Sequence, residues 1–254
     1  MARASKKRRR PVQLDLPTAR SSKPPGRGGF REGAGRKPGK GRRSVRHRVR
    51  EAHSSLHPVH VVLRSKFKPL RCQFVFPTIR KALAKATRAR RDFRITQFSV
   101  QGDHVHLIVE ADSKSALSRG MQGLAIRVAR AVNALVGRAG KVWADRFFSR
   151  DLKSPRVVRN ALAYVLNNFR KHRAAGASLI DPYSSAPYFS GFRGLAGRAP
   201  CELQASRMLP LAPRGVAPPE KSEDPPIVGA RTWLAEKGWR RGGVIAFSDA
   251  GAVT

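Results

Sequence analysis

The sequence predicts an α+β fold of the ferredoxin-like class, an antiparallel sheet in βαββαβ order with one helix added after the last strand. Residues 58–65 (PVHVVLRS) alternate in polarity and are rich in β-branched side chains, as expected for a strand. Residues 93–100 and 104–110 have the same pattern, and the Gly102-Asp103 turn between them is typical of a hairpin. Segments with apolar residues at helical spacing separate and follow these strands.

Three segments have the period of an amphipathic helix, namely residues 77–91, 113–136 and 154–172. The third begins with Ser154 and Pro155, which suit the N-cap and the first helical turn. The aromatic-rich residues 141–152 (KVWADRFFSRDL) are predicted to form the fourth strand. A ferredoxin-like sheet carries its crossover helices on one face, so the other face is expected to be open.

Composition divides the chain into three parts. Residues 1–55 are rich in Lys, Arg, Gly and Pro and predict a disordered basic arm. Residues 56–176 contain the periodic segments and predict the folded domain. Residues 177–254 predict an irregular, Pro/Gly-rich extension, in which residues 230–247 form a small helix and a strand that dock on the core.

The charge of the chain predicts a polyanionic partner. The sequence holds 52 Lys and Arg against 16 Asp and Glu, which gives a formal net charge of +36. Nucleic acid is the first candidate, because binding to phosphates releases condensed counterions. A membrane surface is the weaker alternative, since the basic residues are spread along the chain rather than gathered on one amphipathic helix. Gly35-Arg36-Lys37-Pro38 resembles an AT-hook core, although a generic basic tail explains it equally well.

Other features favour a bacterial cytoplasmic, nucleoid-associated protein. No apolar run approaches the roughly 18 to 20 residues of a transmembrane helix. The N-terminus is charged from its third residue and lacks the apolar region of a secretory signal. Cys72 and Cys201 lie far apart, which excludes a CxxC zinc site.

Two pairs of residues could carry chemistry. His104 and His106 share one face of a predicted strand, because residues i and i+2 of a strand point the same way. A His-x-His pair arises often by chance, so by itself it is a modest sign of a metal site. Tyr164 and Asn168 are neighbours on one face of the predicted last helix. A tyrosine in that position more often anchors the helix, and only the combination of both pairs indicates a site.

That combination resembles the HUH transposases with a single tyrosine nucleophile, especially the REP-associated tyrosine transposases. The matching motifs are His104-Val105-His106 and the Tyr164–Asn168 segment, together with the first strand at residues 58–64 and the string around Trp143. The resemblance covers about residues 57–175. It departs from the family at Phe169, where a proline is frequent, and at Asp103, where an asparagine is frequent, which leaves a domesticated member open.

The resemblance implies a role for each matching residue. His104 and His106 would bind a divalent metal, Mg²⁺ or Mn²⁺, and Asn168 would add a side-chain oxygen. Tyr164 would be the nucleophile, leaving a 5′-phosphotyrosine link and a free 3′-OH. The expected partner is single-stranded or hairpin DNA, and a homodimer is left open.

Nine basic residues are predicted to contact DNA, with a solvated basic face as the alternative. They are Arg36, Lys37, Arg64, Arg127, Arg130, Arg146, Arg150, Arg170 and Lys171. His60 falls on the His104 face of its strand and is interpreted as structural or as a phosphate contact. Glu110 falls on the same face and is expected to be solvated or salt-bridged rather than a third ligand.

The sequence therefore predicts a transposase-like enzyme that cleaves and rejoins single-stranded DNA. A catalytically silent DNA-binding protein with the same fold is the first alternative. The second is an RNA-binding domain of the RRM type, which would need exposed aromatic residues on its central strands. Residues 104–110 contain none, which disfavours it.

Overall fold

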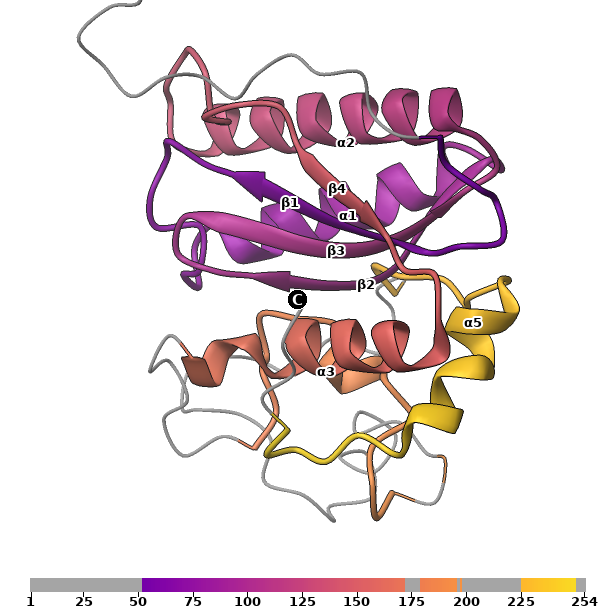
Figure 1. Ribbon diagram of the computed structural model, residues 1–254. Helices are drawn as coiled ribbons and strands as arrows, with labels where there is room; N and C mark the ends of the chain where they lie inside the picture. The colour runs from indigo at the N-terminus through magenta and orange to yellow at the C-terminus, as the bar shows by residue number, and fades with distance from the viewer. Residues whose placement is uncertain (1–51, 172–178, 196, 198–224, 250–254) are drawn as a thin grey trace, which may run out of the picture. The chain divides into compact units, whose positions relative to one another are not determined.

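The computed structural model describes residues 52–171, 179–195, 197 and 225–249, and most of the predicted basic arm lies outside these ranges (Figure 1). The elements of the domain follow the predicted βαββαβ order with one added helix. They are β1 (Val59–Arg64), α1 (Phe76–Arg88), β2 (Phe93–Val100), β3 (His104–Ala111), α2 (Lys114–Leu135), β4 (Phe148–Asp151) and α3 (Pro155–Lys171). The fold is ferredoxin-like, as the sequence predicts.

The four strands form one antiparallel sheet in the order β2-β3-β1-β4. Strand β3 is therefore central and is paired on both edges, to β1 and to β2. Two paired neighbours hold a strand backbone in place through ladder hydrogen bonds on both sides. Side chains on β3 thus project from one of the most constrained backbones of the domain.

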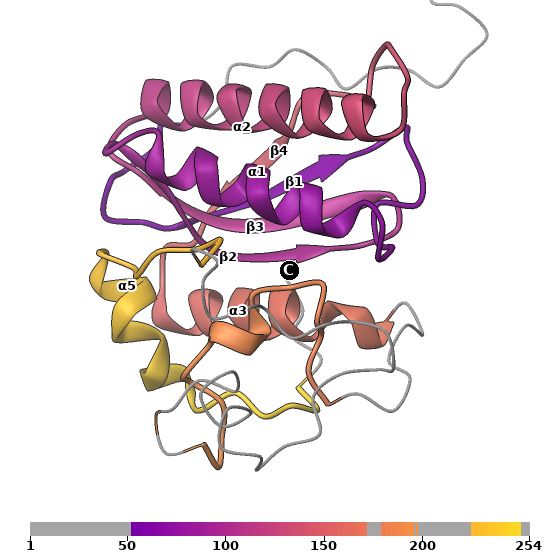
Figure 2. The same cartoon turned by 180° about the vertical axis from the view of Figure 1, so that it is seen from behind.

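The helices α1 and α2 lie on one side of the sheet and α3 lies on the other (Figures 1 and 2). The first side is a core in which Val61, Leu107 and Val109 of the strands pack against the apolar stripes of α1 and α2. Helix α2 approaches the sheet closely at Gly120, where an added Cβ would lie 2.2 Å from Cγ of Phe93.

The opposite face of the sheet is not open, which corrects the prediction from fold class. Helix α3 covers it, with Val158, Leu162, Val165 and Leu166 buried in a second core that also contains Ile108 of β3. The spacing of these residues gives α3 an apolar stripe that needs a partner, and the free face of the sheet supplies it.

The fourth strand is shorter than predicted. Only Phe148–Asp151 forms β4, while Trp143 makes an isolated bridge with Ser65. The indole N–H of Trp143 donates to the carbonyl of Ala125 in α2, at 2.8 Å. This bond directs the chain towards α2, and the ladder with β1 resumes only at Phe148.

Parts of the C-terminal extension pack directly on the domain. The segment 179–195 runs beside β2, where the amide of Val100 donates to Tyr183 and the amide of Ser185 donates to Phe98, both at 2.9 Å. Arg71 fixes the segment by a two-point ion pair with the buried Asp181, at 3.0 and 2.7 Å.

The segment 225–249 contains the short helix α5 (Trp233–Glu236) and the 3-10 turn η2 (Gly238–Gly242), both beside α3. The strand predicted at its end is reduced to one parallel bridge between Phe192 and Ile245. In the described part of the chain, no helix is both long and apolar enough to cross a membrane.

Candidate active site

The His pair lies on the face of β3 that α3 covers. The rings of His104 and His106 are perpendicular, with centroids 4.7 Å apart. His106 is buried and His104 is half-buried. The strand geometry therefore places two imidazoles side by side, as the sequence predicts.

Helix α3 brings Tyr164 to this pair. The Tyr164 ring meets the His106 ring edge to face, with centroids 5.1 Å apart. Asn168 follows one turn later on the same helix and is 1% exposed. Residues that are about 60 positions apart in the sequence thus form one cluster within a single chain.

A third histidine belongs to the cluster. His60 of β1 stacks on His106 with ring centroids 5.3 Å apart, and His60 Nε2 lies 3.2 Å from His106 Nδ1. The same ring meets Tyr164 edge to face at 6.0 Å. Sequence reasoning found the correct strand face for His60 but gave it no part in the site. The missing signal was the pairing of β1 with β3, which puts His60 and His106 on diagonal positions.

Burial and neighbouring charge shift the pKa values of three groups in the cluster. Burial and then the charge of Arg150 lower the pKa of His60 to about 4, so its imidazole is neutral at pH 7. Burial raises the pKa of Tyr164, which keeps the phenol protonated. The hydrogen bond from His104, aided by Lys68, lowers the pKa of Asp103 to about 2. Asp103 is therefore an ionised acceptor.

The hydrogen bonds of the cluster suit a divalent cation. His104 Nδ1 lies 2.7 Å from the carboxylate of Asp103, and His106 Nδ1 contacts His60. With the proton on Nδ1 in these contacts, Nε2 of each ring would be the nitrogen that coordinates a cation. A carboxylate behind a histidine is a common support for a metal ligand. The side-chain amide of Asn168 is buried and makes no hydrogen bond in the described structure.

Two Nε2 atoms and one amide oxygen are an N/O donor set that fits Mg²⁺ or Mn²⁺. Within the described ranges, no group of three or more His, Cys, Asp and Glu side chains is arranged to hold a metal. Asn168 is accordingly the residue that would complete a set of three protein ligands.

Glu110 has a different role from the histidines on its strand face. Its buried carboxylate accepts hydrogen bonds from the backbone N–H groups of Arg231 and Thr232, both at 2.9 Å, and from the Thr232 hydroxyl at 2.8 Å. Arg94 adds an ion pair at 3.7 Å. Glu110 is thus salt-bridged, which is one of the two roles expected from the sequence. Its hydrogen bonds hold the C-terminal segment against β3.

Residues 53–168 match the model of the family described as transposase, IS200-like. The matched domain is similar to this family. The match spans the strands, both crossover helices and α3 up to Asn168, so all residues of the cluster lie within it. The match supports a transposase-like role for the domain.

Two solved structures resemble the IS200-like domain. One is a REP-associated tyrosine transposase bound to a REP hairpin, with 18% identity, a TM-score of 0.45, and coverage of 56% of this chain and 82% of the other. The second is a candidate transposase from Deinococcus radiodurans R1, with 15% identity, a TM-score of 0.32, and coverage of 44% and 87%. No curated protein matches the sequence.

The basic residues predicted to bind DNA divide into separate groups around this transposase domain. Arg64 pairs with His104 in the β1–β3 register and Arg150 pairs with His60 in the β1–β4 register, so both exposed arginines lie on the strand face of the cluster. The exposed Arg146 precedes β4. These three are the predicted DNA contacts that lie on the strands of the sheet or next to them.

The other predicted DNA contacts lie elsewhere. Arg127 and Arg130 are exposed on α2, across the sheet from the cluster. Arg170 stacks on Phe169 and donates to the carbonyl of Leu179, at 3.1 Å. Arg36, Lys37 and the side chain of Lys171 lie outside the described residues.

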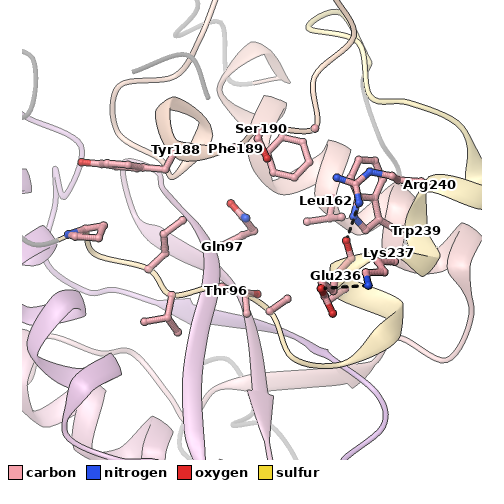
Figure 3. Close-up of a pocket in the computed structure, with 17 residues that line it drawn as sticks. Thr96, Gln97, Leu162, Tyr188, Phe189, Ser190, Glu236, Lys237, Trp239 and Arg240 are labelled. Carbon is pink, nitrogen blue, oxygen red and sulfur yellow. Dashed lines mark hydrogen bonds and ion pairs between the residues drawn. The ribbon is translucent and has the colours of Figure 1, made fainter. Parts of the chain in front are cut away.

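A pocket of about 580 Å³ opens on the α3 side of the transposase domain (Figure 3). Its walls come from β2, α3, η1 (Ala186–Tyr188) and the C-terminal segment. Tyr188, Phe189 and Trp239 are its aromatic residues, and the side chain of Gln97 points into it. None of the histidines of the cluster lines this pocket.

Proposed function

We propose that the protein cleaves and rejoins single-stranded DNA through a covalent phosphotyrosine intermediate on Tyr164. The observation that carries the proposal is the contact of Tyr164 with His106 of the His pair, at a ring distance of 5.1 Å. A nucleophile beside two candidate cation ligands is an arrangement that can catalyse phosphoryl transfer.

The step is an in-line displacement at phosphorus. The Tyr164 oxygen forms a bond to the phosphorus, the bond to the 3′ oxygen breaks, and that oxygen leaves as a 3′-OH after taking up a proton. The product is a 5′-phosphotyrosine. Because a phosphodiester is exchanged for a phosphodiester, a second 3′-OH can reverse the step and join strands without ATP.

The cluster residues have separate tasks in this step. Burial raises the pKa of Tyr164, so the phenol must lose its proton during attack. His104, His106 and Asn168 would hold the cation, and Asp103 would keep His104 in the ligating tautomer. When bound, the cation supplies positive charge that stabilises the phosphate oxygens in the transition state.

The charge of the chain supports DNA as the partner. The net charge of +36 favours any polyanion, while Arg64 and Arg150 place positive charge on the strand face that bears the histidines. The REP hairpin in the solved transposase complex provides the first class of oligonucleotide to test.

A denaturing gel tests the proposal. Purified protein is incubated with labelled single-stranded hairpin oligonucleotides and Mn²⁺ or Mg²⁺, and a covalent protein–DNA band is expected. Tyr164→Phe and chelation should each abolish the band, and His106→Ala should reduce it by at least about 100-fold. Tyr183→Phe is the matched control, because this tyrosine packs on Phe76 away from the cluster and should leave the band unchanged.

The catalytically silent alternative gives a different result in the same experiment. It predicts native-gel shifts with no covalent band across diverse oligonucleotides. A band that persists in Tyr164→Phe would contradict the assignment of the nucleophile.

A further inference from the structure

The pocket beside β2 has a polar floor that a strand irregularity creates. The β2–β3 register passes from Ile95 opposite Val109 to Gln97 opposite Ile108, so β2 carries a bulge at Thr96. Ile95 and Phe98 both face the core under α1 and α2. Thr96 and Gln97 therefore both line the pocket on the α3 side. A bulge that re-aims side chains is a frequent feature beside functional sites.

Ser185 orients the Gln97 amide, because its hydroxyl lies closer to Gln97 Oε1, at 2.6 Å, than to the carbonyl of Phe98, at 3.2 Å. The Ser185 hydroxyl donates to Gln97 Oε1 at 2.6 Å and itself accepts from the amide of Phe98 at 2.9 Å. With the carbonyl side held, the amino group is the end of the Gln97 side chain left to donate to a ligand. Figure 3 shows this side chain projecting into the space between Tyr188 and Trp239.

The rest of the pocket fits a flat, partly apolar ligand attached to phosphate. Of its aromatic residues, Tyr188 is partly exposed and can stack on a ring, while Phe189 and Trp239 are buried beneath the pocket. Its volume of about 580 Å³ lies within the range of small-ligand pockets. Lys237 and Arg240 are exposed at the rim. The carboxylate lining the pocket is that of Glu236, and it lies 3.8 Å from the ammonium of Lys237.

The pocket adjoins the catalytic cluster. Gln97 pairs with Ile108, which is two residues from His106 along β3, a distance of roughly 7 Å along the strand. One strand of DNA could therefore place a phosphate at Tyr164 and a nearby base in the pocket.

We propose that this pocket binds an unpaired nucleobase close to the cleaved phosphate. It prefers thymine or guanine, which carry a carbonyl at pyrimidine C4 or purine C6, over cytosine and adenine, which carry an amino group at that position. Tyr188 would stack on the base, and the Gln97 amino group would donate to the carbonyl oxygen at C4 or C6. The inference rests on the proposed function, because it takes single-stranded DNA as the substrate.

Binding of short homo-oligomers tests the preference without chemistry. The full-length protein is titrated with labelled dT6, dI6, dA6 and dC6 at fixed salt and without metal, with inosine standing in for guanine because it keeps the carbonyl. We expect dT6 and dI6 to bind at least about fivefold tighter than dA6 and dC6. Gln97→Leu should remove the difference, and Tyr188→Ala should weaken all four.

Gln122→Leu is the matched control, since it makes the same change at an exposed position of α2 on the other side of the sheet. Arg240→Ala, at an exposed rim position, guards against misfolding of the buried-site variants and should weaken all four oligomers without changing their order. Equal binding of the four oligomers by the unmodified protein would overturn the inference, as would an unchanged preference in a folded Gln97→Leu protein.

The two proposals fail in different ways. A base preference that depends on Gln97, found without any covalent band, would support the proposed base pocket and contradict the proposed enzyme activity. A covalent band, found together with a base preference that Gln97→Leu does not change, would support the enzyme activity and contradict the base pocket.

Discussion

At the scale of residues, the contact between His60 and His106 decides which nitrogen of His106 can bind a cation. If His106 Nδ1 carries the proton and donates to His60 Nε2, then His106 Nε2 keeps its lone pair. The opposite tautomer would put the proton on His106 Nε2 and block it. The low pKa of His60, about 4, keeps it neutral and able to accept this hydrogen bond.

His60→Phe is therefore expected to weaken metal binding. Phenylalanine keeps a ring against His106 and Tyr164 but removes the hydrogen bond. Loss of a supporting partner behind a metal ligand costs about 10- to 100-fold in affinity. The affinity for Mn²⁺ is measured by electron paramagnetic resonance on the free protein.

His57→Phe provides the comparison, because His57 precedes β1 and makes no contact with the cluster rings in the described structure. Equal Mn²⁺ affinities in the two variants would show that His60 only fills space.

At the scale of elements, the position of α3 depends on what packs behind it. Trp239, Phe189 and Leu234 bury its outer side in the second core. The C-terminal segment that supplies two of these residues is tied to β3 through Glu110 and Thr232. The helix that bears Tyr164 is thus held between the sheet and the extension.

Glu110→Gln should loosen this segment. An amide in place of the carboxylate turns one acceptor oxygen into a donor that faces backbone N–H groups, and it leaves Arg94 with a weaker partner. Hydrogen bonds to a charged group contribute about 1.5–3 kcal/mol each, so the free energy of unfolding should fall by about 2 kcal/mol or more. Hydrogen exchange should quicken over residues 231–236.

Glu236→Gln is the control for this change, because Glu236 is exposed on α5. Exchange rates over residues 231–236 that stay the same in Glu110→Gln would mean that the apolar contacts alone hold the segment.

Elements that depend on local periodicity could be predicted, and those that depend on distant partners could not. The stripes of α2 and α3 and the shared face of His104 and His106 follow from spacing alone. The late start of the fourth strand depends on the bond from Trp143 to α2. The bulge at Thr96 and the anchoring of residues 231–232 by Glu110 also involve residues far away in the sequence.

At the scale of the whole molecule, the net charge of +36 sets how strongly binding responds to salt. The predicted arm, residues 1–55, contains a large share of the Lys and Arg, including the run Lys6–Arg10. The described domain contributes its own basic residues at Arg64 and Arg150. Affinity from the arm and affinity from the domain should therefore be separable by deletion.

Deleting residues 1–50 should weaken DNA binding most at low salt and flatten its salt dependence. For single-stranded DNA, each phosphate that the protein no longer neutralises reduces the slope of log K against log salt by about 0.7. Fluorescence anisotropy titrations from low to physiological salt measure this slope.

A variant with Arg36→Ala and Lys37→Ala in the intact arm tests whether the AT-hook-like motif or the total charge of the arm accounts for binding, because it removes two charges at the motif alone. A slope that survives deletion would place the phosphate contacts in the folded domain. A double variant as weak as the deletion would identify the motif as the binding element of the arm.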